Sequence, residues 1–146
     1  MIKVTSPKTA AEFKQYYALR WRILRKPWKQ PEGSEQDKTD HQINDCYHII
    51  AIENNIVYGV ARLEFFAENQ FQIRYMAVDD LHQGKGIGRK IIMHIENYSQ
   101  QKNATEIVLN ARENALGFYQ KLGYEVTEKS YVLFGSIQHF KMIKTL

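Results

Sequence analysis

The sequence has little of what marks secreted, membrane-spanning or metal-binding proteins. It contains one cysteine, Cys46, in 146 residues, so a disulfide framework and a thiolate metal site are both excluded. No apolar run approaches the roughly 20 residues that a membrane-spanning helix needs, and residues 1–4 do not begin a signal peptide. We therefore expect a cytoplasmic protein without a bound metal, in which Cys46 is a buried or inert thiol.

Strong charge of either sign is also missing. The formal net charge is +4 at pH 7, and there is no dense basic run with interleaved aromatic residues of the kind that binds nucleic acid. Nucleic acid is therefore not an expected partner, and attraction to an anionic cofactor or substrate explains the mild positive charge equally well. Hydrophobic residues make up 44% of the chain, which is ordinary for one globular domain, here residues 1–146.

Glycine is scarce, yet three of the eight glycines stand at the alternate positions 84, 86 and 88. The apolar run 73–78 before them is typical of a strand, and the segment after them has helical periodicity. A strand, a glycine-rich turn and a helix start form a cradle for an anion, because the first N–H groups of the helix lack partners and the helix dipole is positive there. Lys85 and Arg89 add full charges, so we expect a pyrophosphate at this place.

Two common nucleotide motifs do not fit this turn. Position 89 is Arg, which breaks the third-glycine spacing of a dinucleotide fingerprint, and no acidic residue ends a second strand about 20 residues on. No Gly-Lys-Ser/Thr sequence closes the turn, so it is not a Walker loop. The pattern Gln83-x-x-Gly86-x-Gly88 after the strand Met76–Val78 instead resembles the acyl-CoA-binding motif of the GNAT superfamily of N-acetyltransferases.

A second segment shows the same resemblance. Residues 115–124 match in full the Ala-x-x-Phe-Tyr-x-Lys-x-Gly-aromatic helix that follows a strand in GNAT enzymes. Together with the order of elements, the two motifs extend the resemblance over roughly residues 47–146. One position departs from the pattern: Arg112 stands where many relatives have an Asn that binds pantetheine. Asn110 and Asn114 lie on either side of it, and which of them takes the role is open.

The resemblance implies an α/β fold, the GNAT fold, with a mixed, mostly antiparallel sheet of seven strands flanked by about four helices. Alternating and apolar patterns predict the strands independently. The expected strands are 2–5, 48–52, 56–66, 71–78, 106–110, 126–134 and 138–144. Helices are expected after a capping box at Thr9, after the glycine-rich turn and at 115–122, whereas 27–46 is expected to contain little regular structure.

The activity that the resemblance implies is direct transfer of an acetyl group from acetyl-CoA to an amine. A neutral amine attacks the thioester, a tetrahedral oxyanion forms, and the CoA thiolate leaves. By similarity, a backbone N–H within Met76–Val78 stabilises the oxyanion. Tyr119 is expected to donate the proton to the thiolate, because a phenol with a pKa of about 10 stays protonated at pH 7. The alternative is that Phe118 and Tyr119 are both core aromatics.

The residues expected to contact acetyl-CoA lie on the strand before the turn, in the turn itself and in the second motif. They are Met76, Ala77, Val78, Gln83, Gly84, Lys85, Gly86, Ile87, Gly88, Arg89, Asn110, Asn114, Phe118 and Tyr119.

The general base is harder to assign. Glu64, near the end of a long strand, is the first candidate, and His41, His139 and Glu35 follow it. Each is equally compatible with a solvated surface group, and a chain of water molecules can also remove the proton. Arg62 and Arg74 are expected either to meet an anionic substrate or to pair with Glu64.

The acceptor is expected to be a primary amine of a small molecule or peptide. Residues 28–41 are predicted to form one wall of its pocket, with Glu35, Asp37 or Asp40 available to attract a cationic amine. The alternative for this segment is a solvated linker. The alternative for the whole protein is a non-catalytic acyl-CoA-binding module, and the sequence leaves a homodimer open.

Overall fold

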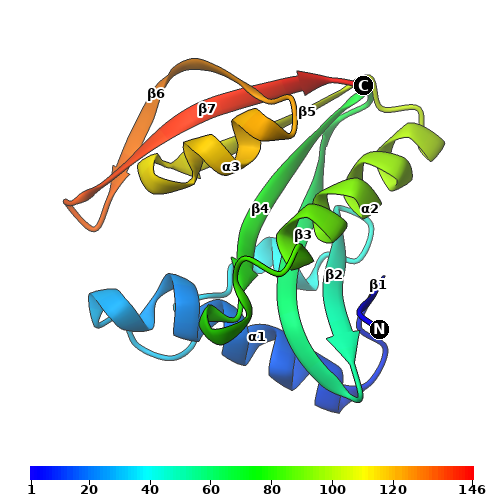
Figure 1. Ribbon diagram of the computed structural model, residues 1–146, viewed down its shortest axis with the longest axis vertical. Coiled ribbons are helices and arrows are strands. Elements are labelled where there is room, and N and C mark those ends of the chain that lie inside the picture. The colour runs from blue at the N-terminus through cyan, green and yellow to red at the C-terminus, as the bar shows by residue number, and fades with distance from the viewer.

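One mixed sheet crosses the whole molecule in the computed structural model, which describes residues 1–146 (Figure 1). The strands lie in the order β1-β2-β3-β4-β5-β7-β6. Their bounds are β1 Lys3–Thr5, β2 Cys46–Glu53, β3 Ile56–Ala67, β4 Gln70–Val78, β5 Glu106–Arg112, β6 Glu125–Leu133 and β7 Ile137–Thr145. Only β4 and β5 are parallel, and all other neighbours are antiparallel. Each expected strand is present, with bounds that differ by at most two residues.

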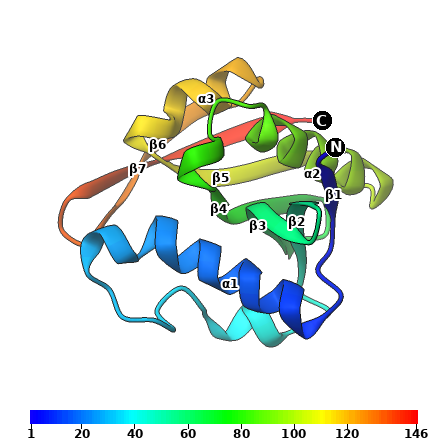
Figure 2. The ribbon, with the colours of Figure 1, turned by 60° about the horizontal axis from the view of Figure 1, so that its bottom comes forward.

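Three α-helices flank the sheet, and not about four as expected: α1 (Ala10–Leu24), α2 (Ile87–Gln101) and α3 (Leu116–Lys121). The other helical segments are short 3₁₀ turns, η1 Lys26–Trp28, η2 Lys38–His41, η3 Asp80–His82 and η4 Glu113–Ala115. Helix α1 covers one face of the sheet, whereas α2 and α3 lie on the other (Figure 2). None of the helices combines the length and hydrophobicity that a membrane crossing requires.

Helix α1 begins where the capping residues predict. The hydroxyl of Thr9 accepts a hydrogen bond from the backbone N–H of Glu12 at 3.1 Å, and the Glu12 carboxylate accepts one from the N–H of Lys8 at 2.8 Å. The buried side of α1 packs on β2, β3 and β4 in a cluster of seven residues. They are Tyr16, Leu19, Leu24, Ile50, Val57, Val60 and Ala77.

Helix α2 lies very close to the opposite face. Its apolar stripe, Ile87, Ile91, Ile92 and Ile95, is buried. A Cβ added to Gly59 of β3 would lie 2.8 Å from Ile91 and 2.9 Å from Ile87, closer than real Cβ contacts allow. The missing side chain at Gly59 therefore fixes how deeply α2, and with it the glycine-rich turn, sits on the sheet.

The two parallel strands diverge halfway along β4. They are paired only from Gln70 with Glu106 to Ile73 with Leu109. Beyond that point Tyr75 has a φ of +53°, a left-handed conformation that is uncommon for a residue with a side chain. Neither Tyr75 nor Met76 has a ladder partner on β3 or β5. A bulge thus leaves unpaired backbone in the middle of the sheet.

The connection between α1 and β2 is more deeply buried than its polar sequence predicted. Glu35 is 3% and Asp40 is 6% exposed. Asp40 lies 2.8 Å from Arg20 of α1 and 3.0 Å from Arg62 of β3, both of which are fully buried. Asp37 pairs with Arg62 as well. The expectation that Asp37 and Asp40 attract a cationic amine is therefore wrong, because internal arginines already neutralise both carboxylates.

Candidate active site

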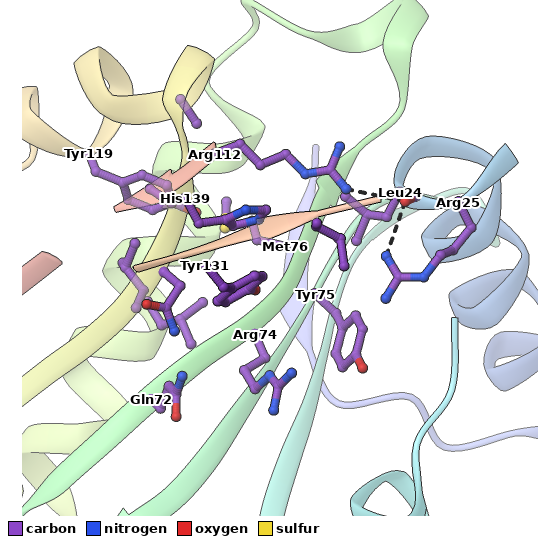
Figure 3. Close-up of a pocket in the computed structure, with 16 residues that line it drawn as sticks. Leu24, Arg25, Gln72, Arg74, Tyr75, Met76, Arg112, Tyr119, Tyr131 and His139 are labelled. Atoms are coloured by element: carbon purple, nitrogen blue, oxygen red, sulfur yellow. Dashed lines mark hydrogen bonds between the residues drawn. The ribbon is translucent and has the colours of Figure 1, made fainter. Parts of the chain in front are cut away.

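A cavity of about 260 Å³ opens where β4 and β5 diverge (Figure 3). Residues 72–76 of β4 and 109–112 of β5 form its walls, together with the C-terminal end of α1, with Tyr119 and with the β6–β7 hairpin. The cavity lies here because β4 and β5 diverge. A hydrogen-bonded neighbouring strand would otherwise fill the space between them.

The glycine-rich turn forms an open cradle at the start of α2. Gly84 and Gly86 have φ values of +79° and +80°, and a Cβ added at either position would meet no atom within 4 Å. The space above both residues is free, so the cradle has room for an anionic group such as a pyrophosphate to approach bare backbone. Lys85 and Arg89 are exposed beside it. The Gln83 amide donates a hydrogen bond to the Val78 carbonyl at 3.1 Å, which ties the turn to the end of β4.

Gly88 connects this cradle to the cavity. A Cβ at Gly88 would lie 3.0 Å from the ring of Phe118 and 3.4 Å from the methyl group of Met76. Met76 itself lines the cavity. Gly88 therefore lies where three parts of the molecule meet: the glycine-rich turn, the segment 115–124 and the bulge of β4. An extended cosubstrate would have to contact all three.

Phe118 and Tyr119 point in different directions. Phe118 is about one-third exposed beside Gly88, whereas Tyr119 is buried and lines the cavity. The Tyr119 hydroxyl makes no hydrogen bond within the protein, unlike that of nearby Tyr124, which donates to Glu96 at 2.9 Å. Burial raises the pKa of Tyr119 above its usual value, so this phenol holds its proton throughout the physiological range.

His139 of β7 lines the same cavity and is 4% exposed. Its Nδ1 lies 3.1 Å from the Ile137 carbonyl. A carbonyl only accepts hydrogen bonds, so Nδ1 is the protonated nitrogen and Nε2 keeps a free lone pair. Tyr131 stacks on the ring at a centroid distance of 4.4 Å. Burial lowers the pKa of His139, and the charges of Arg112 and Arg25 lower it further. The imidazole is therefore neutral at pH 7.

The other candidate bases lie outside the cavity. Glu64 accepts a hydrogen bond from Arg62 at 2.7 Å. Glu35 is buried and accepts one from the backbone N–H of Gly33 at 2.8 Å, and His41 is exposed. The expected pairing of Arg62 with Glu64 is thus present, and Glu64 itself does not reach the cavity.

The remaining expected cofactor residues divide into two groups. Of the two asparagines expected to meet pantetheine, Asn110 lines the cavity, whereas Asn114 is exposed in η4. The side chains of Ala77 and Ile87 are buried in the two cores, so only their backbone groups are free to meet a ligand.

The cavity also contains residues that no sequence motif marked as functional, among them Arg25, Tyr75 and Tyr131. Arg25 directly follows α1, Tyr75 lies on β4 and Tyr131 lies on β6, and no motif joins these segments. The left-handed backbone at Tyr75 has no local mark either, because no glycine or asparagine stands there. Only the pairing of distant strands brings the three residues together.

Comparison with known proteins agrees with this geometry. Residues 29–146 match the family model of the acetyltransferase (GNAT) domain. The uncharacterised N-acetyltransferase YjcF of Bacillus subtilis is 24% identical over 143 residues, which are 98% of this chain and 99% of that protein. An acyl-CoA N-acyltransferase structure from Pseudomonas aeruginosa has a TM-score of 0.84 at 20% identity, over 99% of both chains.

A GNAT family acetyltransferase from Elizabethkingia anophelis, solved with acetyl-CoA bound, has a TM-score of 0.78 at 17% identity, over 99% of this chain and 98% of that one. The resemblance found in the two motifs and the expected seven-stranded α/β fold are confirmed. The chain belongs to the GNAT family of acetyltransferases, and it is an acetyl-CoA-dependent N-acetyltransferase.

Proposed function

We propose that this enzyme transfers the acetyl group directly to the primary amine of a small molecule bound in the cavity between β4 and β5. One observation supports this most strongly. The cavity brings together the unpaired backbone at Tyr75 and Met76, the unpartnered hydroxyl of Tyr119 and the neutral imidazole of His139. When bound, acetyl-CoA supplies the acetyl thioester. Residues 84–88 would hold its pyrophosphate, and Asn110 would meet its pantetheine arm.

The bulge of β4 provides the oxyanion site. Tyr75 and Met76 have no register partner on either neighbouring strand, and the strand around them fixes the position of their backbone N–H groups before any substrate arrives. A preorganised donor of this kind is typically worth 10²- to 10³-fold in rate, roughly 3–4 kcal/mol. Met76 acts through its backbone, so its side chain is free to pack against Gly88.

Tyr119 holds the proton for the leaving thiolate. Tyr119 lines the cavity, and its hydroxyl makes no hydrogen bond within the protein. Because burial raises the pKa of Tyr119, the group remains a hydrogen-bond donor at neutral pH. It can therefore donate to sulfur as negative charge develops there.

His139 receives the proton from the acceptor amine. Its Nδ1–H is fixed by the Ile137 carbonyl, so Nε2 is the atom that accepts the proton. His139 was one of the alternatives to Glu64, and burial in the cavity wall favours it, because Glu64 is already engaged by Arg62.

Release of the CoA thiol from acetyl-CoA, followed in the presence of a library of primary amines, tests the proposal. At least one small amine should increase thiol release well above the rate of spontaneous hydrolysis, and mass spectrometry should find its acetylated product. Tight binding of acetyl-CoA without turnover of any amine would instead favour the non-catalytic binding module.

A further inference from the structure

The charges that line the cavity are all of one sign. Arg25, Arg74 and Arg112 contribute to its wall, and no Asp or Glu does. Arg74 has a distant carboxylate partner, Glu64 at 4.0 Å. Arg25 and Arg112 have none within that distance. A site for a cationic amine alone would be expected to contain the opposite charge.

The two unpaired arginines are held beside one another. Nη1 of Arg25 and Nη2 of Arg112 both donate to the carbonyl oxygen of Leu24, at 3.1 and 3.2 Å (Figure 3). Two guanidinium groups thus converge on one backbone atom at the C-terminal end of α1. Like charges this close repel, and burial together with the charge of Arg25 lowers the pKa of Arg112.

Elsewhere the protein neutralises the arginines that it buries. Arg20 pairs with Asp40 at 2.8 Å, and Arg62 pairs with Asp37 at 2.6 Å. Arg25 and Arg112 are instead held by neutral groups. The Arg112 guanidinium lies 4.4 Å from the ring centre of Trp28, and Nε of Arg25 donates to the Ser34 carbonyl at 3.2 Å.

Donors remain free on both side chains. Nε and Nη1 of Arg112 and Nη2 of Arg25 have no hydrogen-bond partner in the protein. The planar guanidinium presents its N–H groups in a fork that matches a carboxylate or a phosphate. The positions of both side chains are thus fixed, while part of their hydrogen-bonding capacity is left for a ligand.

We infer that the acceptor amine of this enzyme also bears an anionic group, a carboxylate or a phosphate, which Arg25 and Arg112 bind. The inference rests on the proposed function, since it describes the acceptor of that same cavity. It reverses the charge that residues 28–41 predicted for the acceptor site. It also gives Arg112 a role: the residue that replaces the family's Asn holds the acceptor.

The test compares matched amines at saturating acetyl-CoA. Amino acids are compared with their amides, and aminoalkyl phosphates with the corresponding amino alcohols, so that the two anionic groups are told apart. The best acid or phosphate should exceed its neutral counterpart by roughly 10- to 100-fold in kcat/KM, as expected for hydrogen bonds to a charged group. Equal or faster turnover of the neutral counterparts would overturn the inference.

Variants connect this preference to the two side chains. Arg112→Gln and Arg25→Gln should each raise the KM of the preferred acceptor by roughly tenfold or more, and should reduce its advantage over the neutral counterpart. Lys26→Gln is the matched control, because it removes the same charge from an exposed neighbour of Arg25 outside the cavity. An equal effect of Lys26→Gln would show that only the overall charge matters and would contradict the inference.

If no amine is acetylated, calorimetry tests the proposed function and the anion site separately. Acetyl-CoA binding without turnover counts against the proposed function, and the anion site is then tested by titrating the same compounds into the CoA complex. Acids or phosphates that bind more tightly than their neutral counterparts, with the difference lost in Arg112→Gln, would support the site. Absence of such a difference would overturn it.

Discussion

The guanidinium group of Arg62 is hydrogen-bonded to both carboxylate oxygens of Asp37, at 2.6 and 3.0 Å, across 25 residues of sequence. The hydroxyl of Tyr75 also donates to Asp37, at 3.1 Å. Asp37 therefore connects a strand of the central sheet, the connection after α1 and the bulged residue at the cavity. The ion pair is structural, and it supports the backbone that forms the proposed oxyanion site.

Arg62→Met should strongly destabilise the fold. It removes the partner of Asp37 and one of the two partners of buried Asp40, and breaking a buried pair typically costs about 3–5 kcal/mol. Urea unfolding followed by circular dichroism measures this loss. Arg22→Met is the control, since Arg22 pairs with Asp79 at the surface, where such pairs contribute less than about 1 kcal/mol. Similar losses in both variants would show that the buried network is unimportant.

Acid should weaken the same network within a defined pH range. Burial on its own raises the pKa of Asp37, but hydrogen bonds from Arg62 and Tyr75 and the charge of Arg62 outweigh it and lower this pKa from 3.8 to about 2. The folded state therefore binds fewer protons than the unfolded chain, and the stabilising contribution of Asp37 is complete above about pH 4 and lost as the pH falls towards 2. Asp37→Asn should show a shallower decline of the urea midpoint across this range. An unchanged slope would contradict the prediction.

Gly86→Val should abolish binding of acetyl-CoA. Gly86 has a φ of +80° and open space where a side chain would stand, so a β-branched residue resists the backbone conformation and blocks the approach of the pyrophosphate. Isothermal titration calorimetry measures the affinity. Gly33→Val is the matched control, because Gly33 also has a positive φ, +99°, and free surroundings, but lies in the connection after α1. Retained affinity in a folded Gly86→Val variant would place the pyrophosphate elsewhere.

Tyr119→Phe should reduce kcat by roughly 10²-fold or more, since it removes the proposed proton donor and keeps the ring. Stability and acetyl-CoA affinity should change little, because the hydroxyl of Tyr119 borders the cavity and makes no hydrogen bond within the protein. Tyr124→Phe removes the hydrogen bond to Glu96 and should change stability more than turnover. Full activity of Tyr119→Phe would make Tyr119 a core aromatic without a chemical role.

His139→Gln should lower kcat by roughly 10²-fold or more if the imidazole is the base. Because burial lowers the pKa of His139, the base is already neutral at pH 7. In the unmodified enzyme kcat should therefore fall only as the pH drops below 6.5, the ordinary value, and the variant should lose this acidic limb. Glu64→Gln is the comparison variant. A larger loss of kcat in Glu64→Gln than in His139→Gln would indicate that Glu64 is the base.

Much of the fold could be predicted because its signals are local. The alternation in 46–67 and the isoleucine stripe of α2 each depend on a few consecutive residues, and the structure contains the corresponding elements. The positive φ values of Gly84 and Gly86 are also local features, because glycine adopts such values more readily than other residues. The two GNAT motifs belong to this class, and for that reason the family could be identified from the residues alone.

Only the tertiary structure shows which charged side chains are paired and where the cavity lies. Asp37 and Asp40 belong to a segment that looks like a solvated loop until Arg20 and Arg62, from other elements, are placed beside them. The burial of a charged side chain depends on partners that are far away in the sequence, and no periodic pattern of the sequence indicates these partners. The same holds for Arg25 and Arg112, which share the Leu24 carbonyl across 87 residues of chain. The sequence by itself determined the family and the glycine-rich turn, whereas the positive charge of the cavity follows only from which side chains the folded sheet leaves unpaired.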